Sequence, residues 1–190
     1  MPIKAGIGHL IIAKHARDQL NLEKVIFVPA FIPPHKVTGI SATPPERLTM
    51  AKLAVKGNRS FSVSPVEFKR QGISYTVDTV KAIQGQYPNA ELFLIVGSDN
   101  EVQFESWKSP KEISLMATLA VYERRGIPGI EEPTAPRTVS IRLKGHWLDI
   151  SSSAIRLRMT EGKSIRYLVP PAVEQFIMKH KLYHRPFLAK

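Results

Sequence analysis

Short apolar runs alternate with longer amphipathic segments along this chain. Most of these runs end at proline, glycine or polar residues, a pattern typical of strands buried on both faces. We expect such strands at residues 25–28, 61–66, 92–96 and 118–122, and a last one within residues 139–148. The amphipathic segments repeat apolar residues at helical spacing, which predicts helices. These helices are expected at residues 9–20, 45–55, 77–86, 110–116, 153–161 and 171–180.

The alternation of strands with helices predicts an α/β fold. We expect a Rossmann-like, doubly wound and mostly parallel sheet, because parallel strands need crossover connections. The chain has 190 residues, enough for one domain with a sizeable core, and we expect residues 1–190 to form that domain. Residues 151–190 would be its C-terminal helical portion. Pro65 lies within the strand expected at residues 61–66 and indicates an irregularity or a sheet edge.

Composition excludes several classes of protein. The chain has no cysteine, which excludes disulfides, thiolate nucleophiles and cysteine-based zinc sites. No apolar run approaches the roughly 18 residues that span a bilayer. The N-terminus lacks the charged and apolar layout of a signal peptide. We therefore expect a cytoplasmic protein with no membrane partner.

The charge of the chain favours anionic partners. Lysine and arginine total 27 against 16 aspartate and glutamate residues, which gives a net charge of +11. Such a balance suits nucleotides, nucleic acid or acidic lipid. The basic residues are scattered, however, and no recognised RNA or DNA motif is present, which disfavours a nucleic-acid-binding protein.

Polar residues collect in the loops that follow the predicted strands. Ligands of doubly wound sheets bind at the carboxyl ends of the strands. The first loop carries Lys36, a cation that either reaches a phosphate or is simply solvated. After the strand at residues 92–96, Gly97 allows a sharp turn and Asp99 is either a fixed acceptor or a helix N-cap. Trp107 fits against a ligand ring or into the core.

Two helix starts in the N-terminal half of the chain can also serve a ligand. Helix starts offer unpaired N–H groups and a positive dipole end. Gly8 and His9 open the first helix, where glycine allows close approach and histidine can donate to an anion. Ser74 or Thr76 can cap the helix expected at residues 77–86.

A third helix start, near the carboxyl end, is the most informative. Three consecutive serines, Ser151 to Ser153, open it, and Arg156 follows one turn later. Backbone amides, hydroxyl groups and a guanidinium can together hold a phosphate. An ordinary N-cap with a surface arginine explains the same pattern.

Five segments in this order resemble bacterial nicotinate-nucleotide adenylyltransferases, which are nucleotidyltransferases with the motif (H/T)-x-G-H. The resemblance extends from about Gly8 to Tyr183, nearly the whole chain. The segments are Pro33–Lys36 with Arg47 beyond it, Ser74–Thr79, Gly97–Asp99 with Trp107, Ile150–Arg156, and Ile165–Pro170 with Leu182–Tyr183.

The resemblance implies adenylyl transfer, in which ATP and nicotinate mononucleotide give nicotinate adenine dinucleotide and pyrophosphate. By that analogy the catalytic residues are His9, Lys36 and Arg156. The residues implied to bind ATP are Gly8, His9, Ser152, Ser153 and Arg156. Those implied to bind the nicotinate nucleotide are Thr76, Asp99, Trp107 and Lys108, with Trp107 stacked on the pyridine ring. Mg²⁺ would be carried on the ATP phosphates, so that no protein metal site is expected.

The N-terminus departs from the family pattern. Gly8 and His9 match the end of the motif, but Gly6 stands at its first histidine position. The family's opening strand and its glycine-rich loop have no counterpart in residues 1–8. We expect that this sequence begins late, through a misplaced start or a truncated gene. An in-frame upstream stretch that encodes the loop would support this expectation, and a stop codon directly before Met1 would contradict it.

Three functions therefore compete. The first is the adenylyltransferase. The second is a degenerate relative that binds a nucleotide without turnover, since the downstream segments are complete and the N-terminal phosphate loop is not. The third, a basic nucleic-acid-binding protein, rests on the net charge alone and would show steeply salt-dependent binding to generic RNA.

Overall fold

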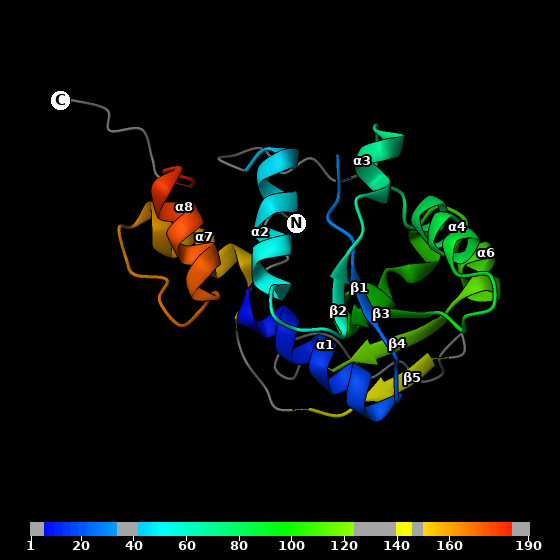
Figure 1. The fold of residues 1–190 in the computed structure, drawn as a ribbon. Coiled ribbons are helices and arrows are strands. Elements are labelled where there is room, and N and C mark those ends of the chain that lie inside the picture. Colours follow the sequence, from blue (N-terminus) through cyan, green and yellow to red (C-terminus); the bar gives the residue numbers. More distant parts are fainter. Residues whose placement is uncertain (1–5, 34–41, 124–139, 146–149, 184–190) are drawn as a thin grey trace. The chain divides into compact units, whose positions relative to one another are not determined.

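The computed structural model describes residues 6–33, 42–123, 140–145 and 150–183 (Figure 1). The chain divides into two compact units. Unit 1 consists of residues 1–11, 23–73 and 148–190, and unit 2 of residues 12–22 and 74–147. Helix α1 (Ile7–Gln19) contributes its first turn to unit 1 and the rest to unit 2. A single domain over residues 1–190 stays a prediction.

In the described part of unit 1, a pair of parallel strands is combined with four helices. Strand β1 (Val25–Phe27) pairs with β2 (Phe61–Val63), so that Val25 faces Phe61 across the pair. The helices are α2 (Pro44–Val55), α3 (Val66–Arg70), α7 (Ser152–Thr160) and α8 (Pro171–Lys179). Helices α2, α7 and α8 share one apolar core, which includes Met50, Ile155 and Ile177. Helices α7 and α8 are the last helices of the described chain (Figure 1), and a C-terminal helical portion over residues 151–190 stays a prediction.

Unit 2 contains a three-stranded parallel sheet. Its strands follow the order β3 (Phe93–Gly97), β4 (Thr118–Tyr122) and β5 (Ser140–Leu143). Helices α4 (Thr76–Gln86) and α6 (Pro110–Met116) lie side by side, joined by an ion pair between Lys81 and Glu112 (Figure 1). A short helix α5 (Ser98–Val102) and a 3₁₀ turn (Phe104–Ser106) connect β3 to α6.

The predicted α/β class and the parallel pairing of the strands are confirmed, with three differences. The strand expected at residues 61–66 ends at Val63, because Pro65 occupies the N-cap position of helix α3. Helices α3 and α5 were not expected, since five residues are too few to show a helical period. The described strands also form two sheets rather than one. Residues 1–5 lie outside the described part of the chain, so the missing opening strand stays a prediction.

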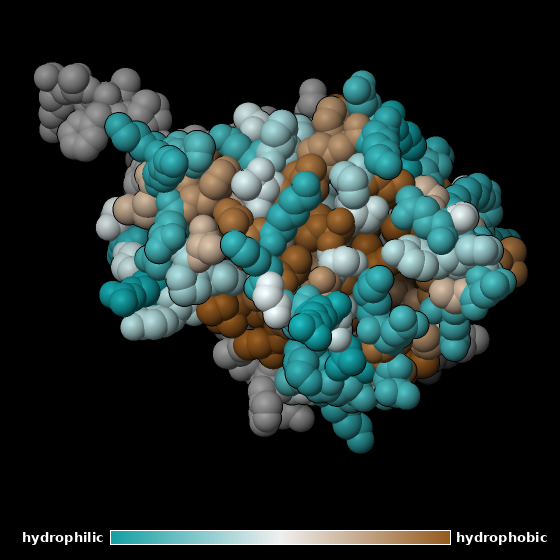
Figure 2. All heavy atoms as spheres, viewed as in Figure 1, coloured by the Kyte–Doolittle hydropathy of each residue, from teal (hydrophilic) through white to brown (hydrophobic). Residues whose placement is uncertain are grey.

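Hydrophilic residues cover much of the visible surface (Figure 2). Large exposed apolar side chains belong to different elements, for example Leu115 on α6 and Leu157 on α7. Within the described ranges, none of the helices has the length and apolar character needed to cross a lipid bilayer.

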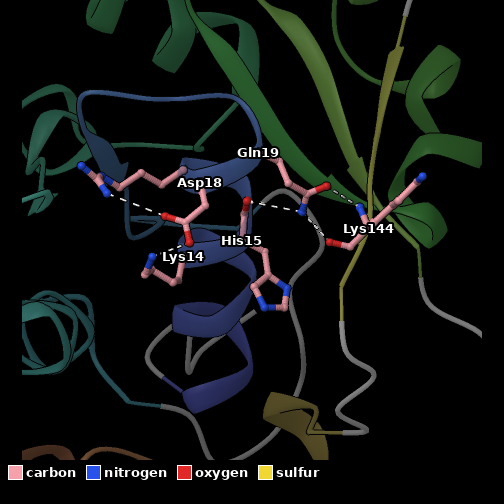
Figure 3. Close-up of polar contacts among 6 residues, drawn as sticks. Lys14, His15, Asp18, Gln19 and Lys144 are labelled. Atoms are coloured by element: carbon pink, nitrogen blue, oxygen red, sulfur yellow. Dashed lines mark hydrogen bonds and ion pairs between the residues drawn. The ribbon is translucent and has the colours of Figure 1, made fainter.

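The second half of α1 is fastened to the chain that leaves β5 (Figure 3). The Gln19 side chain donates through Nε2 to the carbonyl oxygen of Lys144 and accepts through Oε1 from the Lys144 N–H at 2.8 Å. One amide side chain thereby satisfies both backbone groups of Lys144, as a neighbouring strand would. This contact fixes the helix against the sheet of unit 2.

Gly145 lies too close to its neighbours for any side chain. A Cβ atom at this position would meet the imidazole of His15 and would lie 2.5 Å from the Tyr122 hydroxyl oxygen. We expect Gly145→Ala to lower the free energy of unfolding by about 1–3 kcal/mol, because the buried Tyr122 ring has to shift. Urea denaturation measures this change.

Gly85 provides the matched control for this substitution. It lies within helix α4, and no atom lies within 4 Å of where its Cβ would be. Gly85→Ala should therefore stabilise the protein by about 0.5–1 kcal/mol, the difference in helix propensity. If Gly145→Ala also raises the free energy of unfolding, the atoms around Gly145 are packed less tightly than described.

Candidate functional site

The first turn of helix α1 packs directly against the chain that enters helix α7. A Cβ atom on Gly8 would lie 3.2 Å from the carbonyl oxygen of Ile150. A Cβ atom on Gly6 would lie 3.2 Å from Cδ1 of Ile155. The Ile7 N–H donates to the carbonyl oxygen of Leu168 at 3.0 Å. Both glycines therefore permit a close approach that brings the starts of two helices together.

Ser151 is the residue that caps helix α7. Its backbone is extended (φ −98°, ψ 148°), and its hydroxyl accepts from the Ala154 N–H at 3.0 Å. With the capping role taken by Ser151, Ser152 and Ser153 occupy the first turn. This geometry confirms the helix start that the three serines predict and assigns the cap to the first of them.

Arg156 is anchored beside this helix start. Its Nη2 donates to the Ser153 hydroxyl at 3.0 Å. Its Nη1 is buried and has no hydrogen-bond partner among the described residues. Burial lowers the pKa of Arg156, and the nearby Tyr183 opposes that effect. One side of the guanidinium is thus held by the Ser153 hydroxyl, while Nη1 is enclosed by the protein.

His9 is the third residue of α1 and is half-buried. The positive ends of α1 and α7 lie close together here, because Gly8 contacts Ile150 and Ile150 directly precedes the Ser151 cap. Two helix N-termini and a guanidinium favour an anion. Lys36, the further cation that the sequence indicates, lies outside the described residues.

In unit 2, the start of α4 meets the loop before α6. Lys108 places its Nζ 4.4 Å from the centre of the Tyr75 ring and 3.6 Å from Oδ2 of Asp78. The expectation that Ser74 or Thr76 caps α4 is wrong. Tyr75 occupies the N-cap position without a side-chain hydrogen bond, and Thr76 is the first helical residue. The first amides of α4 thus receive no hydrogen bond from the cap side chain.

Trp107 lies at the edge of the unit 2 core. Its ring centre is 5.5 Å from that of Phe104, and the side chain is half-buried. Both roles left open for Trp107 are therefore compatible with its position. The residue after Lys108, Ser109, has a left-handed backbone (φ 53°), which is costly for a serine and shapes this loop.

Asp99 is half-buried inside helix α5 and is therefore not an N-cap. The N-cap position belongs to Gly97, whose φ of −82° is open to any residue. The conformational freedom of glycine is thus not used at Gly97, because the chain passes from strand to helix with ordinary backbone angles.

The structure distributes the candidate residues over the two units. Unit 1 contains Gly8, His9, Ser152, Ser153 and Arg156, and unit 2 contains Thr76, Asp99, Trp107 and Lys108. Three further polar residues next to these candidates had no role assigned from sequence, namely Tyr75, Asp78 and Tyr183. Arg47, which donates to the carbonyl oxygen of Phe31, had none either. The spacing of Arg47 from Met50 and Ala51 indicates that it shares their buried face of α2.

Comparison with known proteins places the chain in a family. The cytidylyltransferase-like family matches residues 6–158. A relative from Salinibacter ruber is 40% identical over 179 residues, which cover 93% of this chain and 91% of the relative. A relative from Exiguobacterium sibiricum is 40% identical over 181 residues, with coverage of 93% and 92%. Both relatives are named as probable nicotinate-nucleotide adenylyltransferases.

Solved structures agree on the fold. The Plasmodium falciparum nicotinic acid mononucleotide adenylyltransferase complexed with NaAD gives a TM-score of 0.68 at 18% identity, with 90% of each chain covered. The complex of that protein with APC gives a TM-score of 0.67 at 18% identity and covers 94% of this chain and 90% of the other. The chain thus belongs to the cytidylyltransferase-like family and, within it, to the nicotinate-nucleotide adenylyltransferases.

Proposed function

We propose that this chain transfers the adenylyl group of ATP to nicotinate mononucleotide and releases pyrophosphate. The observation that carries the proposal is the close packing of the starts of α1 and α7 beside the Arg156 guanidinium. Nη2 of this guanidinium donates to Ser153, and its buried Nη1 has no partner among the described residues. Such an arrangement fits a polyphosphate. The relatives that cover almost the whole chain bear the name of this activity.

The reaction needs positioning and charge stabilisation rather than a covalent enzyme intermediate. A phosphate oxygen of nicotinate mononucleotide attacks the α-phosphorus of ATP, and the bond between the α-phosphorus and the bridging oxygen breaks. Negative charge then grows on the departing pyrophosphate. His9, Arg156 and the amides of the two helix starts would stabilise that charge, with Lys36 assisting. Ser152 and Ser153 would hold the triphosphate, and Gly8 would allow its close approach.

The pyridine end of the acceptor is assigned to unit 2. Trp107 would stack on the pyridine ring. The nicotinate carboxylate would accept from backbone amides near Thr76 and Lys108, where the positive end of α4 favours an anion. This charge supports preference for the acid over the amide. Asp99 would bind ribose or organise the pocket.

Mg²⁺ would reach the site on the ATP phosphates. Within the described ranges, His, Asp and Glu side chains form no group of three or more that could hold a metal ion. A magnesium ion held mainly by phosphate oxygens and water needs few protein ligands. When bound, the ion would neutralise part of the phosphate charge.

Pyrophosphate release by the purified chain, with ATP, Mg²⁺ and nicotinate mononucleotide, tests the proposal. We expect release that depends on both substrates and falls strongly in His9→Ala. Nicotinamide mononucleotide as the acceptor should react more slowly. A folded protein that binds ATP but releases no pyrophosphate would contradict the proposal and favour a nucleotide-binding protein without turnover.

Replacement of Trp107 tests the assignment of the pyridine end. Stacking of a base on an aromatic side chain contributes about 1–3 kcal/mol, so Trp107→Ala should raise KM for nicotinate mononucleotide by about 5–150-fold. KM for ATP should change by less than about twofold, because ATP binding is assigned to unit 1. Trp107→Phe keeps a ring and should restore much of the affinity. Equal losses for both substrates would instead identify Trp107 as a core residue.

A further inference from the structure

We infer that Tyr183 is a positioning residue: its hydroxyl oxygen holds the inner side of the Arg156 guanidinium, so that this group stays oriented toward the phosphates of ATP. The inference rests on the proposed function, because the contact between Arg156 and ATP belongs to that proposal. Tyr183 itself would not touch a substrate. Both residues belong to unit 1.

The Arg156 guanidinium has an outer and an inner side. On the outer side, Nη2 donates at 3.0 Å to the hydroxyl of Ser153, which is an exposed residue. On the inner side, Nη1 is buried and finds no hydrogen-bond partner in the part of the chain that the structure describes. One exposed hydroxyl leaves a planar group free to turn. The orientation of the guanidinium therefore depends on what lies beside Nη1.

The Tyr183 hydroxyl provides the complementary group. Only 2% of Tyr183 is exposed, and its hydroxyl oxygen is buried without a hydrogen-bond partner among the described residues. Burial raises the pKa of Tyr183 to about 12, and the largest opposing effect on this pKa comes from Arg156. Tyr183 in turn opposes the lowering of the Arg156 pKa by burial. The two side chains thus interact, and a phenol oxygen can accept where a guanidinium can only donate.

The other guanidinium near Tyr183, that of Arg47, is already occupied. Its three nitrogen atoms all donate to backbone carbonyl oxygens, which belong to Ala30, Phe31 and Ala42. Its effect on the Tyr183 pKa is also smaller than that of Arg156. Of the two arginines, Arg156 is therefore the one whose buried nitrogen needs an acceptor.

The backbone is strained where it places Tyr183 in the core. After α8 (Figure 1), the Lys181 N–H donates to the Met178 carbonyl oxygen at 3.2 Å, and the Leu182 N–H donates to that of Ile177 at 3.0 Å. With the left-handed Lys181 (φ 50°), these bonds form a Schellman motif, which turns the chain back. Tyr183 follows with a φ of 64°, a conformation that is rare for an aromatic residue. Such strain persists only where the surrounding structure enforces it, and it is concentrated at functional sites.

The hydroxyl group, rather than the ring, is what packing leaves unexplained. Phenylalanine would fill the same space in the core without the cost of a buried hydroxyl. With its pKa raised to about 12, the Tyr183 hydroxyl is neutral near pH 7. It can therefore orient Arg156 without cancelling its positive charge, as a carboxylate would. That charge is needed when pyrophosphate departs in the proposed reaction.

A double-mutant cycle between Tyr183 and Arg156 tests this inference. We expect Tyr183→Phe to lower kcat/KM for ATP about tenfold, with KM for nicotinate mononucleotide changed by less than about twofold, because a misplaced charge loses rate steeply. In an Arg156→Ala background the same substitution should lower kcat/KM by less than about twofold, since the group that it positions is gone. Tyr167→Phe removes the hydroxyl of a tyrosine that is 78% exposed, and this matched control should leave kcat/KM unchanged.

Hydrogen exchange of the arginine side chains, followed by NMR, tests the contact without turnover. In the wild type, the Arg156 guanidinium should exchange more slowly than that of the exposed Arg158. Tyr183→Phe should make exchange at Arg156 at least about tenfold faster and leave exchange at Arg158 unchanged. The comparison within the wild type needs no variant to fold.

The failure of the proposed function can be told apart from the failure of this inference. If the wild type releases no pyrophosphate, the proposed function is wrong, and the same cycle is measured on Kd for ATP with Mg²⁺. Coupled losses together with faster exchange at Arg156 would support the positioning role. Losses that multiply in the cycle, or an exchange rate at Arg156 that Tyr183→Phe does not change, would overturn it.

Discussion

Arg156→Ala should lower kcat/KM for ATP by about a hundredfold to a thousandfold. The guanidinium is fixed on the Ser153 hydroxyl, and its buried Nη1 has no partner among the described residues. A charged donor that meets growing negative charge in a site of low dielectric contributes about 3–4 kcal/mol. Because this charge grows on pyrophosphate, KM for nicotinate mononucleotide should change little. Steady-state kinetics with each substrate varied in turn measure both effects.

Arg158→Ala is the matched control for this result. Arg158 lies on the same helix, is exposed, and donates through Nε to the carbonyl oxygen of Ser164 at 3.0 Å. Its removal should change kcat/KM by less than about threefold. If Arg156→Ala and Arg158→Ala behave alike, the Ser151–Arg156 segment is only a helix cap with a surface arginine.

Tyr183→Phe should make the protein lose less stability than the wild type at alkaline pH. Burial raises the pKa of Tyr183 from 10.0 to about 12, against the opposing effect of the neighbouring Arg156 and Arg47 guanidiniums. Below pH 10 the hydroxyl is protonated in both the folded and the unfolded chain. As the pH rises from 10 to 12, the unfolded chain loses the proton first. Ionisation of Tyr183 should therefore lower the free energy of unfolding of the wild type by about 1.4 kcal/mol at pH 11, and by about 2.7 kcal/mol once the pH is above both pKa values. Tyr183→Phe should not show this loss.

Urea denaturation of both proteins between pH 8 and pH 11 measures this difference. Other groups titrate in the same range, so the result is the gap between the two curves rather than either curve alone. Tyr167→Phe is the control, because the side chain of Tyr167 is 78% exposed. Parallel curves for the wild type and Tyr183→Phe would show that water reaches the Tyr183 hydroxyl.

The sequence predicts elements well where the signal is local and strong. Helix α6 and strand β4 begin and end at the expected residues, because a proline opens the helix and an uninterrupted apolar run forms the strand. The strand at Phe61 was expected to be too long, since alternation continues past the point where Pro65 begins a helix. Periodicity also cannot show how strands distribute between sheets, because strand pairing joins residues far apart in the chain.

In the candidate site, too, features that depend on neighbouring residues could be predicted, and features that depend on distant residues could not. The start of α7 after Ser151 could be predicted because capping depends on neighbouring residues, whereas α1 begins at Ile7, two residues before the expected start. The environment of Arg47 could not, since its partners Ala30 and Phe31 precede it by 17 and 16 residues. Tyr183 meets Arg156 only after the chain folds back from α8. Roles that depend on such contacts require the structure.

The division of unit 1 into three stretches has a consequence for synthesis. A ribosome delivers the chain from the N-terminus, and residues 74–147 of unit 2 are complete before residue 148 is added. The core of unit 1, in contrast, needs Ile155, Val173, Ile177 and Tyr183, all within the last quarter of the polypeptide. The nascent protein can therefore complete unit 2 first, and unit 1 closes its core only when translation is almost over.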